Sequence, residues 1–233
     1  MIIFFDKLPS TNEYALTYGK EFKEWSLIWA KVQTKGRGRL GRSWYSPEGG
    51  LWFSIILKPG RALPLLTLSF SVSVARVLRN RGLDVYLKWP NDLIIGRKKV
   101  GGLLCEYDAL EGMVAAGFGI NCNLDVVDFP IVLRDKITTV RKELGYDLGL
   151  QELMEEIVDA LKPIYDAVLK GKTAKLISSW REMSKSIGRS VVVKLPDETI
   201  KGYAIDVDDQ GRLLVRTDFG VKKIVAGDVK FIE

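Results

Sequence analysis

The sequence predicts an α+β protein: a mixed, mostly antiparallel sheet with helices on one side, followed by a small C-terminal β-barrel of the SH3-like kind. Strand-like apolar runs come in consecutive groups, without the strand–helix alternation of a doubly wound sheet. Two longer stretches have apolar residues at helical spacing. After Gly188, short strand patterns alternate with turn residues. We therefore expect a larger domain over residues 1–186 and the barrel over residues 187–233.

The N-terminal part of the chain predicts a strand, a helix and two further strands. The apolar run Ile2–Asp6 indicates the first strand. Ser10 and Glu13 have the spacing of a capping box, so a short helix should follow them. Loose alternation predicts a strand at Ser26–Gln33. The unbroken apolar run Leu51–Leu57 is typical of a buried strand.

The next part predicts one helix and four strands. Apolar residues recur at helical spacing within Pro64–Asn80. A short strand is expected at Val85–Lys88, and turn residues between Leu93–Ile95 and Lys99–Glu106 predict a hairpin. Val114–Asn123 completes this group as a strand that is rich in glycine.

The C-terminal part changes from helices to short strands. Residues 150–185 are expected to be helical, with breaks near Pro163 and Gly171. Turn residues then separate four apolar runs, which predict the strands of the barrel. These runs are Ser190–Leu195, Thr199–Asp206, Leu213–Thr217 and Val221–Val225.

The composition excludes several kinds of chemistry. The chain has no histidine, which removes Ser-His-Asp and Cys-His catalysis and imidazole metal ligands. Cys105 and Cys122 are too few for a zinc site, and we expect them to be buried free thiols. No apolar run approaches the ~18 residues that span a bilayer. We therefore expect a cytoplasmic protein that does not associate with membranes.

The most informative segment is the glycine-arginine loop, Gly36–Arg42, which holds three glycines and three arginines in seven residues. Glycines leave backbone amides free to face a ligand, and arginines supply forked donors for phosphate or carboxylate. The net charge is +6, yet residues 187–233 contain eight basic and eight acidic residues. Because the loop is a single copy between strands, a small-ligand site is favoured over an arginine-rich RNA-binding stretch.

Three further segments place charges or glycines at the ends of strands. Lys88–Asp92 has a charge at each end of a rigid X-Pro turn, which fits either a shared phosphate and Mg²⁺ target or a simple capped turn. Lys99 precedes Gly101-Gly102, and Gly117–Asn121 contains two more strand glycines. Such glycines mark close approach of a ligand or another backbone. Lys99 taken alone fits an exposed hairpin lysine better. Together, the segments predict a cleft for a flat or extended ligand beside phosphates.

With these segments in hand, the chain resembles the biotin–protein ligases, which form biotinyl-AMP and transfer biotin to a carrier protein. The resemblance covers essentially the full length, with the motifs in family order. They are Ser10-Thr11-Asn12, Gln33, Gly36–Arg42, Trp44, Lys88–Asp92, Lys99–Gly102 and Gly117–Asn121.

The resemblance implies a fold like that of class II synthetases and biotin ligases, in which residues 1–186 form the catalytic domain that binds biotin and ATP. It implies Mg²⁺ as the metal, a lysine of a biotin carboxyl carrier protein domain as the acceptor, and a homodimer. Since the first strand begins at residue 2, we expect the short form without an N-terminal DNA-binding domain, and no DNA binding.

The resemblance also implies roles for individual residues. Ser10, Thr11 and Gln33 would bind the ureido ring of biotin. The catalytic residues would be Lys99 and Arg39 at the biotin carboxylate and α-phosphate, and Asp92, which would hold Mg²⁺ or orient the incoming lysine. The implied ligand-binding residues are Ser10, Thr11, Asn12, Gln33, Gly36, Arg37, Gly38, Arg39, Arg42, Trp44, Lys88, Asn91, Lys99, Gly102, Gly119 and Asn121.

Within this set, Trp44 would pack near the adenine and Asn121 would lie on the nucleotide side.

Two alternative functions stay open. A lipoate or octanoate ligase of the same fold would use a similar lysine, but it lacks the glycine-arginine loop in this form. An RNA-binding module with an SH3-like tail is disfavoured by the neutral charge of residues 187–233.

Overall fold

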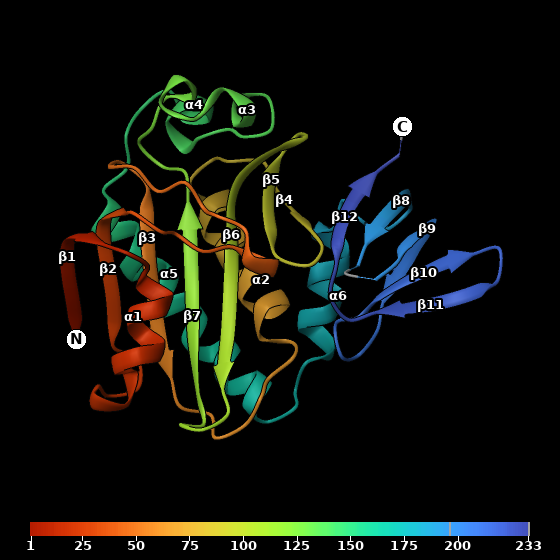
Figure 1. The fold of residues 1–233 in the computed structure, drawn as a ribbon, viewed down its shortest axis with the longest axis horizontal. Helices are drawn as coiled ribbons and strands as arrows, with labels where there is room; N and C mark the ends of the chain where they lie inside the picture. The colour runs from red at the N-terminus through yellow and green to blue at the C-terminus, as the bar shows by residue number, and fades with distance from the viewer. Residues whose placement is uncertain (196, 233) are drawn as a thin grey trace.

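The computed structural model describes residues 1–195 and 197–232, which form two β-sheets and several helices (Figure 1). The strands of the larger sheet are β1 (Ile2–Leu8), β2 (Leu27–Gln33), β3 (Leu51–Leu57), β4 (Val85–Lys88), β5 (Asp92–Ile95), β6 (Lys98–Asp108) and β7 (Met113–Ile120). Those of the smaller sheet are β8 (Arg189–Lys194), β9 (Thr199–Val207), β10 (Leu213–Thr217), β11 (Gly220–Ile224) and β12 (Asp228–Phe231).

The larger sheet is mixed and mostly antiparallel, as the sequence predicts. Its strand order is β1-β2-β3-β7-β6-β5-β4, and the pair β1–β2 runs parallel while the other neighbours run antiparallel. The smaller sheet has the order β11-β10-β9-β8-β12 and is antiparallel throughout. The sequence did not predict β12, whose short apolar-polar alternation becomes a strand by pairing with β8.

The helices are α1 (Thr11–Tyr18), α2 (Leu66–Asn80), α3 (Ile131–Arg134), α4 (Val140–Leu144), α5 (Leu150–Leu169) and α6 (Ala174–Met183). Of these, α3 and α4 are short and were not predicted. The predicted cap at Ser10 is present, because its side chain accepts a hydrogen bond from the Glu13 backbone N–H at 3.4 Å.

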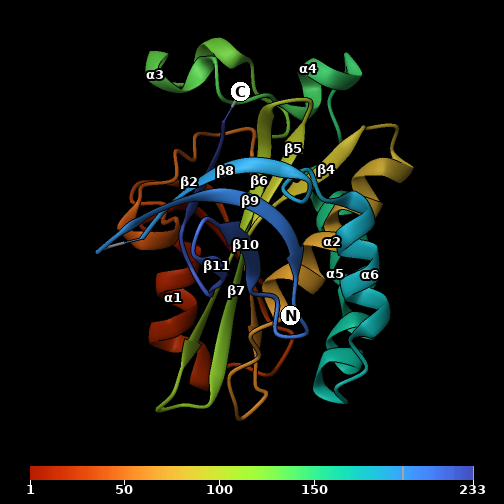
Figure 2. The ribbon, with the colours of Figure 1, turned by 90° about the vertical axis from the view of Figure 1, so that its right-hand side faces the viewer.

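Helices cover both faces of the larger sheet, whereas the sequence predicted them on one side. Figure 2 shows α2, α5 and α6 on one side and α1 on the other. Alternate residues of β3 explain this arrangement: Ile55 packs in the cluster that includes α2 and α5, and Ile56 packs with Ala15 of α1. Because β3 is apolar on both faces, each face needs a cover.

The predicted break near Pro163 does not occur, since α5 runs unbroken through it. Pro163 and Asp159 are both exposed, so water can reach the Asp159 carbonyl that loses its helical partner. Buried Leu161 and Tyr165 hold the helix on either side of the proline. The predicted break at Gly171 is present, where φ is +68°.

The apolar core is continuous between the two sheets. One cluster contains Phe53 and Phe70 of the larger unit together with Val191 and Val193 of β8. Trp89 lies between the sheets and donates a hydrogen bond from Nε1 to the Gly211 carbonyl at 2.9 Å. Within residues 1–195 and 197–232, no helix has the length and apolar character needed to cross a membrane.

Candidate active site

A cavity opens where α1, the glycine-arginine loop, the β4–β5 turn and the start of β12 meet. All but two of the residues predicted as a site line it: Ser10, Thr11, Asn12, Gln33, Arg37, Gly38, Arg39, Arg42, Trp44, Lys88, Asn91, Asp92, Lys99, Gly102 and Gly119. Gly36 and Asn121 do not line the cavity. The topology thus brings together segments that are far apart in the sequence.

The N-terminus of α1 forms a polar floor to the cavity. The Thr11 backbone N–H and Oγ1 both donate to Gln33 Oε1, at 2.8 and 3.1 Å, and Gln33 Nε2 donates to Ser46 Oγ at 2.8 Å. Ser54 Oγ lies 2.7 Å from Thr11 Oγ1 and 2.6 Å from Asn12 Oδ1. Buried side chains joined in this way are held in fixed orientations, which suits recognition of a small polar ring.

The glycines of β7 make room for side chains that pack directly against the backbone of this strand. A Cβ at Gly117 would lie 2.2 Å from Asn12 Oδ1, and a Cβ at Gly119 would lie 2.6 Å from Trp44 Nε1. The close approach predicted from these glycines is therefore made by Asn12 and Trp44. Gly36 has a related role outside the cavity, since its Cβ would lie 2.3 Å from the Trp44 carbonyl oxygen.

Lys99 presents its ammonium group to the cavity beside a carboxylate and an aromatic ring. Its Nζ lies 2.6 Å from Asp92 Oδ1 and 4.7 Å from the centroid of the Trp44 ring. The Lys99 backbone is fixed as well, because its N–H donates to the Lys136 carbonyl at 2.9 Å and its carbonyl accepts from the Thr138 N–H at 3.0 Å. A cation held in this way can face a ligand carboxylate or phosphate without first being ordered.

The three arginines of the glycine-arginine loop have different surroundings. Arg37 pairs with Glu106 at 2.8 Å, and Arg42 makes two hydrogen bonds to Asp228, at 3.1 and 2.8 Å. Arg39 is more buried, and its Nη1 donates to the Gly227 carbonyl at 3.4 Å. Burial lowers the pKa of the Arg39 guanidinium, opposed by the nearby carboxylates, and the group stays charged at neutral pH.

Asn121 lies behind the cavity and not in it. Its Nδ2 donates to the Thr138 carbonyl at 3.1 Å and to the Lys99 carbonyl at 3.4 Å. Its Oδ1 is buried and has no partner among the residues that the structure describes. Asn121 therefore ties the end of β7 to the segment that holds the Lys99 backbone.

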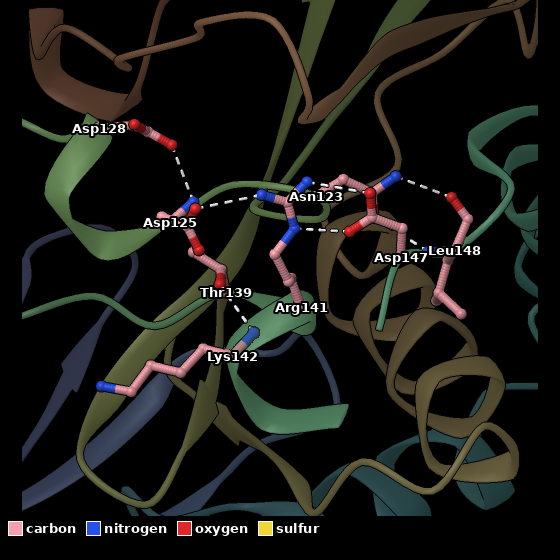
Figure 3. Close-up of polar contacts among 8 residues, drawn as sticks. All are labelled: Asn123, Asp125, Asp128, Thr139, Arg141, Lys142, Asp147 and Leu148. Atoms are coloured by element: carbon pink, nitrogen blue, oxygen red, sulfur yellow. Dashed lines mark hydrogen bonds and ion pairs between the residues drawn. The ribbon is translucent and has the colours of Figure 1, made fainter. Parts of the chain in front are cut away.

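A network of charged and amide groups orders the chain that follows Asn121. Figure 3 shows Arg141 between two carboxylates, with hydrogen bonds to Asp147 at 2.5 and 2.9 Å and to Asp125 at 3.2 Å. The Asn123 side chain and the Leu148 backbone exchange two hydrogen bonds, at 2.8 and 3.0 Å. The segment that carries α3 and α4 is thereby joined to the start of α5.

The residues around the site that sequence reasoning missed include five with polar or close backbone contacts there: Ser46, Ser54, Glu106, Gly227 and Asp228. Glu106 had a weak signal, because an acidic residue follows the apolar run of the glycine-containing strand. Asp228 had none, because it begins β12, a strand that the sequence did not predict, and none of the predicted site motifs lies in residues 187–233. Its place against Arg42 depends on how the two sheets pack.

Comparisons with known proteins give two family matches. Residues 4–125 match the model of the biotin/lipoate A/B protein ligase family, and residues 186–231 match that of the biotin protein ligase C-terminal domain.

Three individual proteins illustrate the similarity. Bifunctional ligase/repressor BirA of Bacillus subtilis is 35% identical over 98% of this chain and 73% of its own length. Biotin--[acetyl-CoA-carboxylase] ligase of Paracoccus denitrificans is 26% identical over 97% and 98%. The structure of the biotin protein ligase from Aquifex aeolicus in complex with biotin and ATP superposes with a TM-score of 0.87, with 29% identity over 99% of this chain and 98% of that one.

Proposed function

The chain belongs to the biotin/lipoate A/B protein ligase family, and we propose that its cavity binds biotin and ATP side by side through the residues described above. The protein is a biotin–protein ligase, which activates biotin with ATP and transfers it to a carrier protein. The observation that supports the proposed site best is the convergence of the polar floor, Lys99 and the glycine-arginine loop on one cavity.

We place the ureido ring of biotin on the polar floor, near Ser10, Thr11 and Gln33. These side chains are buried or half-buried and joined by hydrogen bonds, so they can present donors and acceptors without reorganising. The valeryl chain would then run over Gly102 and Gly119 toward Lys99.

In the first reaction, an oxygen of the biotin carboxylate attacks the α-phosphorus of ATP, and the bond to the β-phosphate oxygen breaks to release pyrophosphate. The biotin carboxylate and the α-phosphate, both anions, must approach each other, and negative charge builds on the phosphoryl oxygens. Lys99 and Arg39 face the cavity and would offset both effects. Binding of ATP would draw Lys99 from its pair with Asp92.

Asp92 is the carboxylate that would hold Mg²⁺. It lines the cavity with its side chain 20% exposed, and Mg²⁺ in such sites takes one or two carboxylates together with substrate phosphates. No cluster of three or more His, Cys, Asp or Glu able to hold a metal occurs in the described part of the chain, which is consistent with a metal that arrives with ATP. When bound, Mg²⁺ would neutralise phosphate charge.

In the second reaction, the amine of the acceptor lysine attacks the acyl carbon of biotinyl-AMP. The bond to the phosphate oxygen breaks, AMP leaves, and the amine loses a proton. The relative from Paracoccus denitrificans is named for acetyl-CoA carboxylase, and the family resemblance implies a biotin carboxyl carrier protein domain as the partner of this chain. We propose that residues 1–186 supply the catalytic groups and that residues 187–233 close the nucleotide side, since Gly227, Asp228 and Val229 line the cavity.

Three further features are part of the proposal. The protein acts in the cytoplasm. It forms a homodimer, as the family resemblance implies. It does not bind DNA specifically, because residues 187–233 have no net positive charge with which to hold phosphates.

A lipoate or octanoate ligase is the alternative within the family, but the match to a biotin protein ligase C-terminal domain disfavours it. The deciding experiment incubates the protein with ATP, Mg²⁺ and either biotin or lipoate. We expect pyrophosphate release and label transfer with biotin alone, onto a carrier domain and not onto its lysine-to-arginine variant. Transfer of lipoate at an equal or higher rate would refute the assignment to biotin.

A further inference from the structure

The loop over the cavity is anchored at both ends by carboxylates, but its central arginine is not. Arg37 pairs with Glu106 of β6, and Arg42 pairs with Asp228 of β12. No carboxylate lies within ion-pair distance of Arg39 in residues 1–195 and 197–232, and its hydrogen bond to the Gly227 carbonyl is long, at 3.4 Å. Arg39 is therefore the arginine of the loop that is free to bind a ligand anion, while Arg37 and Arg42 hold the loop in place.

The anchor for Arg42 belongs to the smaller sheet, where strand pairing and close packing hold it. Asp228 begins β12, opposite Lys194 of β8, and the next residue, Val229, is 1% exposed. Gly227 fits closely against β8, since a Cβ there would lie 2.7 Å from Val193 Cγ1. The hydrogen bonds to Arg42 lower the pKa of the Asp228 carboxyl, with help from Lys88 and Lys230, so the carboxylate is ionised at neutral pH.

The backbone between Arg39 and Arg42 needs such an anchor. Leu40 has φ +54° and Gly41 has φ +70°, so two consecutive residues adopt the left-handed conformation. A leucine rarely adopts this conformation unless other contacts hold it. The chain is closed by a hydrogen bond from the Gly38 N–H to the Arg42 carbonyl at 2.7 Å, so fixing Arg42 also fixes the position of Arg39.

We propose that Asp228 is a positioning residue of the ligase reaction: by holding Arg42 against the smaller sheet, it keeps the glycine-arginine loop closed over biotinyl-AMP. The inference rests on the proposed function, since it assumes that the cavity holds this intermediate. It assigns Arg42 to anchoring the loop and leaves Arg39 for the phosphate. The mixed anhydride is labile in water, so a loop that opens too readily would release it before the carrier lysine arrives.

The test measures release of biotinyl-AMP from Asp228→Asn. The variant enzyme is charged with radiolabelled biotin, ATP and Mg²⁺, freed of excess ligand, and chased with unlabelled biotinyl-AMP. Loss of a partly exposed bidentate ion pair should make the release of biotinyl-AMP about 3- to 10-fold faster than in the wild type. We expect labelling of a bystander protein to rise in parallel. The single-turnover rate of adenylation should change much less, because Arg39 and Lys99 remain.

The matched control is Asp206→Asn. Arg181 of α6 binds Asp206 of β9 through hydrogen bonds of 2.7 and 3.1 Å, which closely match the pair at Arg42. This pair also ties the smaller sheet to the rest of the molecule, but neither residue lines the cavity. We expect Asp206→Asn to leave biotinyl-AMP release unchanged. Equal acceleration in the two variants would show a general loosening of the sheet and would overturn the proposal.

A double-mutant cycle tests whether Asp228 acts through Arg42. Arg42→Gln should accelerate the release of biotinyl-AMP as Asp228→Asn does. If Asp228→Asn does not fold, Arg42→Gln still tests the pair, because it changes only an exposed loop residue. The double variant should release no faster than either single variant. Additive effects would overturn the proposal. Failure of the wild type to form any biotinyl-AMP would instead refute the proposed function, so the two failures are distinguishable.

Discussion

Gly119→Ala should move Trp44 and weaken ATP binding without unfolding the protein. Gly119 lies in β7, and its backbone is not in the left-handed region, so alanine meets no backbone strain there. The new Cβ would lie 2.6 Å from Trp44 Nε1 and 2.7 Å from Cε2, whereas ordinary contacts begin at 3.4 Å. The indole must therefore retreat from the strand.

The structure sets the size of this effect. Forcing an extra carbon into a packed site costs roughly 1–3 kcal/mol. Trp44 is half-buried and can shift outward, so the lower part of that range applies to the free energy of unfolding. The displaced ring also leaves Lys99 Nζ, now 4.7 Å from its centroid. If the ring contacts the adenine, a loss of about 1.4 kcal/mol corresponds to a tenfold higher KM for ATP.

The assay is pyrophosphate release at saturating biotin and varied ATP. The control is Gly171→Ala, where φ is +68° and no atom lies within 4 Å of the new Cβ. This variant should lose stability through backbone strain but keep its KM for ATP. Trp44→Phe in the Gly119→Ala background should restore space and part of the affinity. An unchanged KM in Gly119→Ala would refute the placement of Trp44 on the nucleotide side.

Four further outcomes follow from the site. Lys99→Ala should nearly abolish formation of biotinyl-AMP and Lys98→Ala should reduce it little, because adjacent strand residues face opposite sides; equal losses would refute the catalytic assignment of Lys99. Arg39→Ala should release the intermediate and label bystander proteins, since losing a charge-assisted contact costs about 1.5–3 kcal/mol; labelling confined to the carrier would contradict this. Residues 35–43 should exchange amide hydrogens more slowly with biotin and ATP than without, measured by mass spectrometry, and equal exchange would argue against a closing loop. Cys122 should resist iodoacetamide at pH 8 in the native protein, because burial raises the pKa of its thiol to about 12; rapid alkylation before unfolding would contradict this.

Much of the fold was predictable because the signals are local. The cap at Ser10 depends on a residue three positions away, and the buried strand β3 coincides with an apolar run in the sequence. Two of the misjudged features depend on solvent and packing. Pro163 does not break α5 because it faces water between buried turns, and α1 covers the second face of the sheet because β3 is apolar on both sides.

The sequence by itself determined which chemistry is available: no histidine, one basic glycine-rich loop, and lysines and an aspartate at strand ends. These features depend on residue type and on neighbours close in the chain. Only the tertiary structure decided which arginines of the glycine-arginine loop pair with a carboxylate. Arg42 and Asp228 are 186 residues apart, so their pairing follows from the packing of two sheets and leaves no trace in local spacing. The same packing sets Arg39 apart as the arginine of the loop without a carboxylate partner in the described chain.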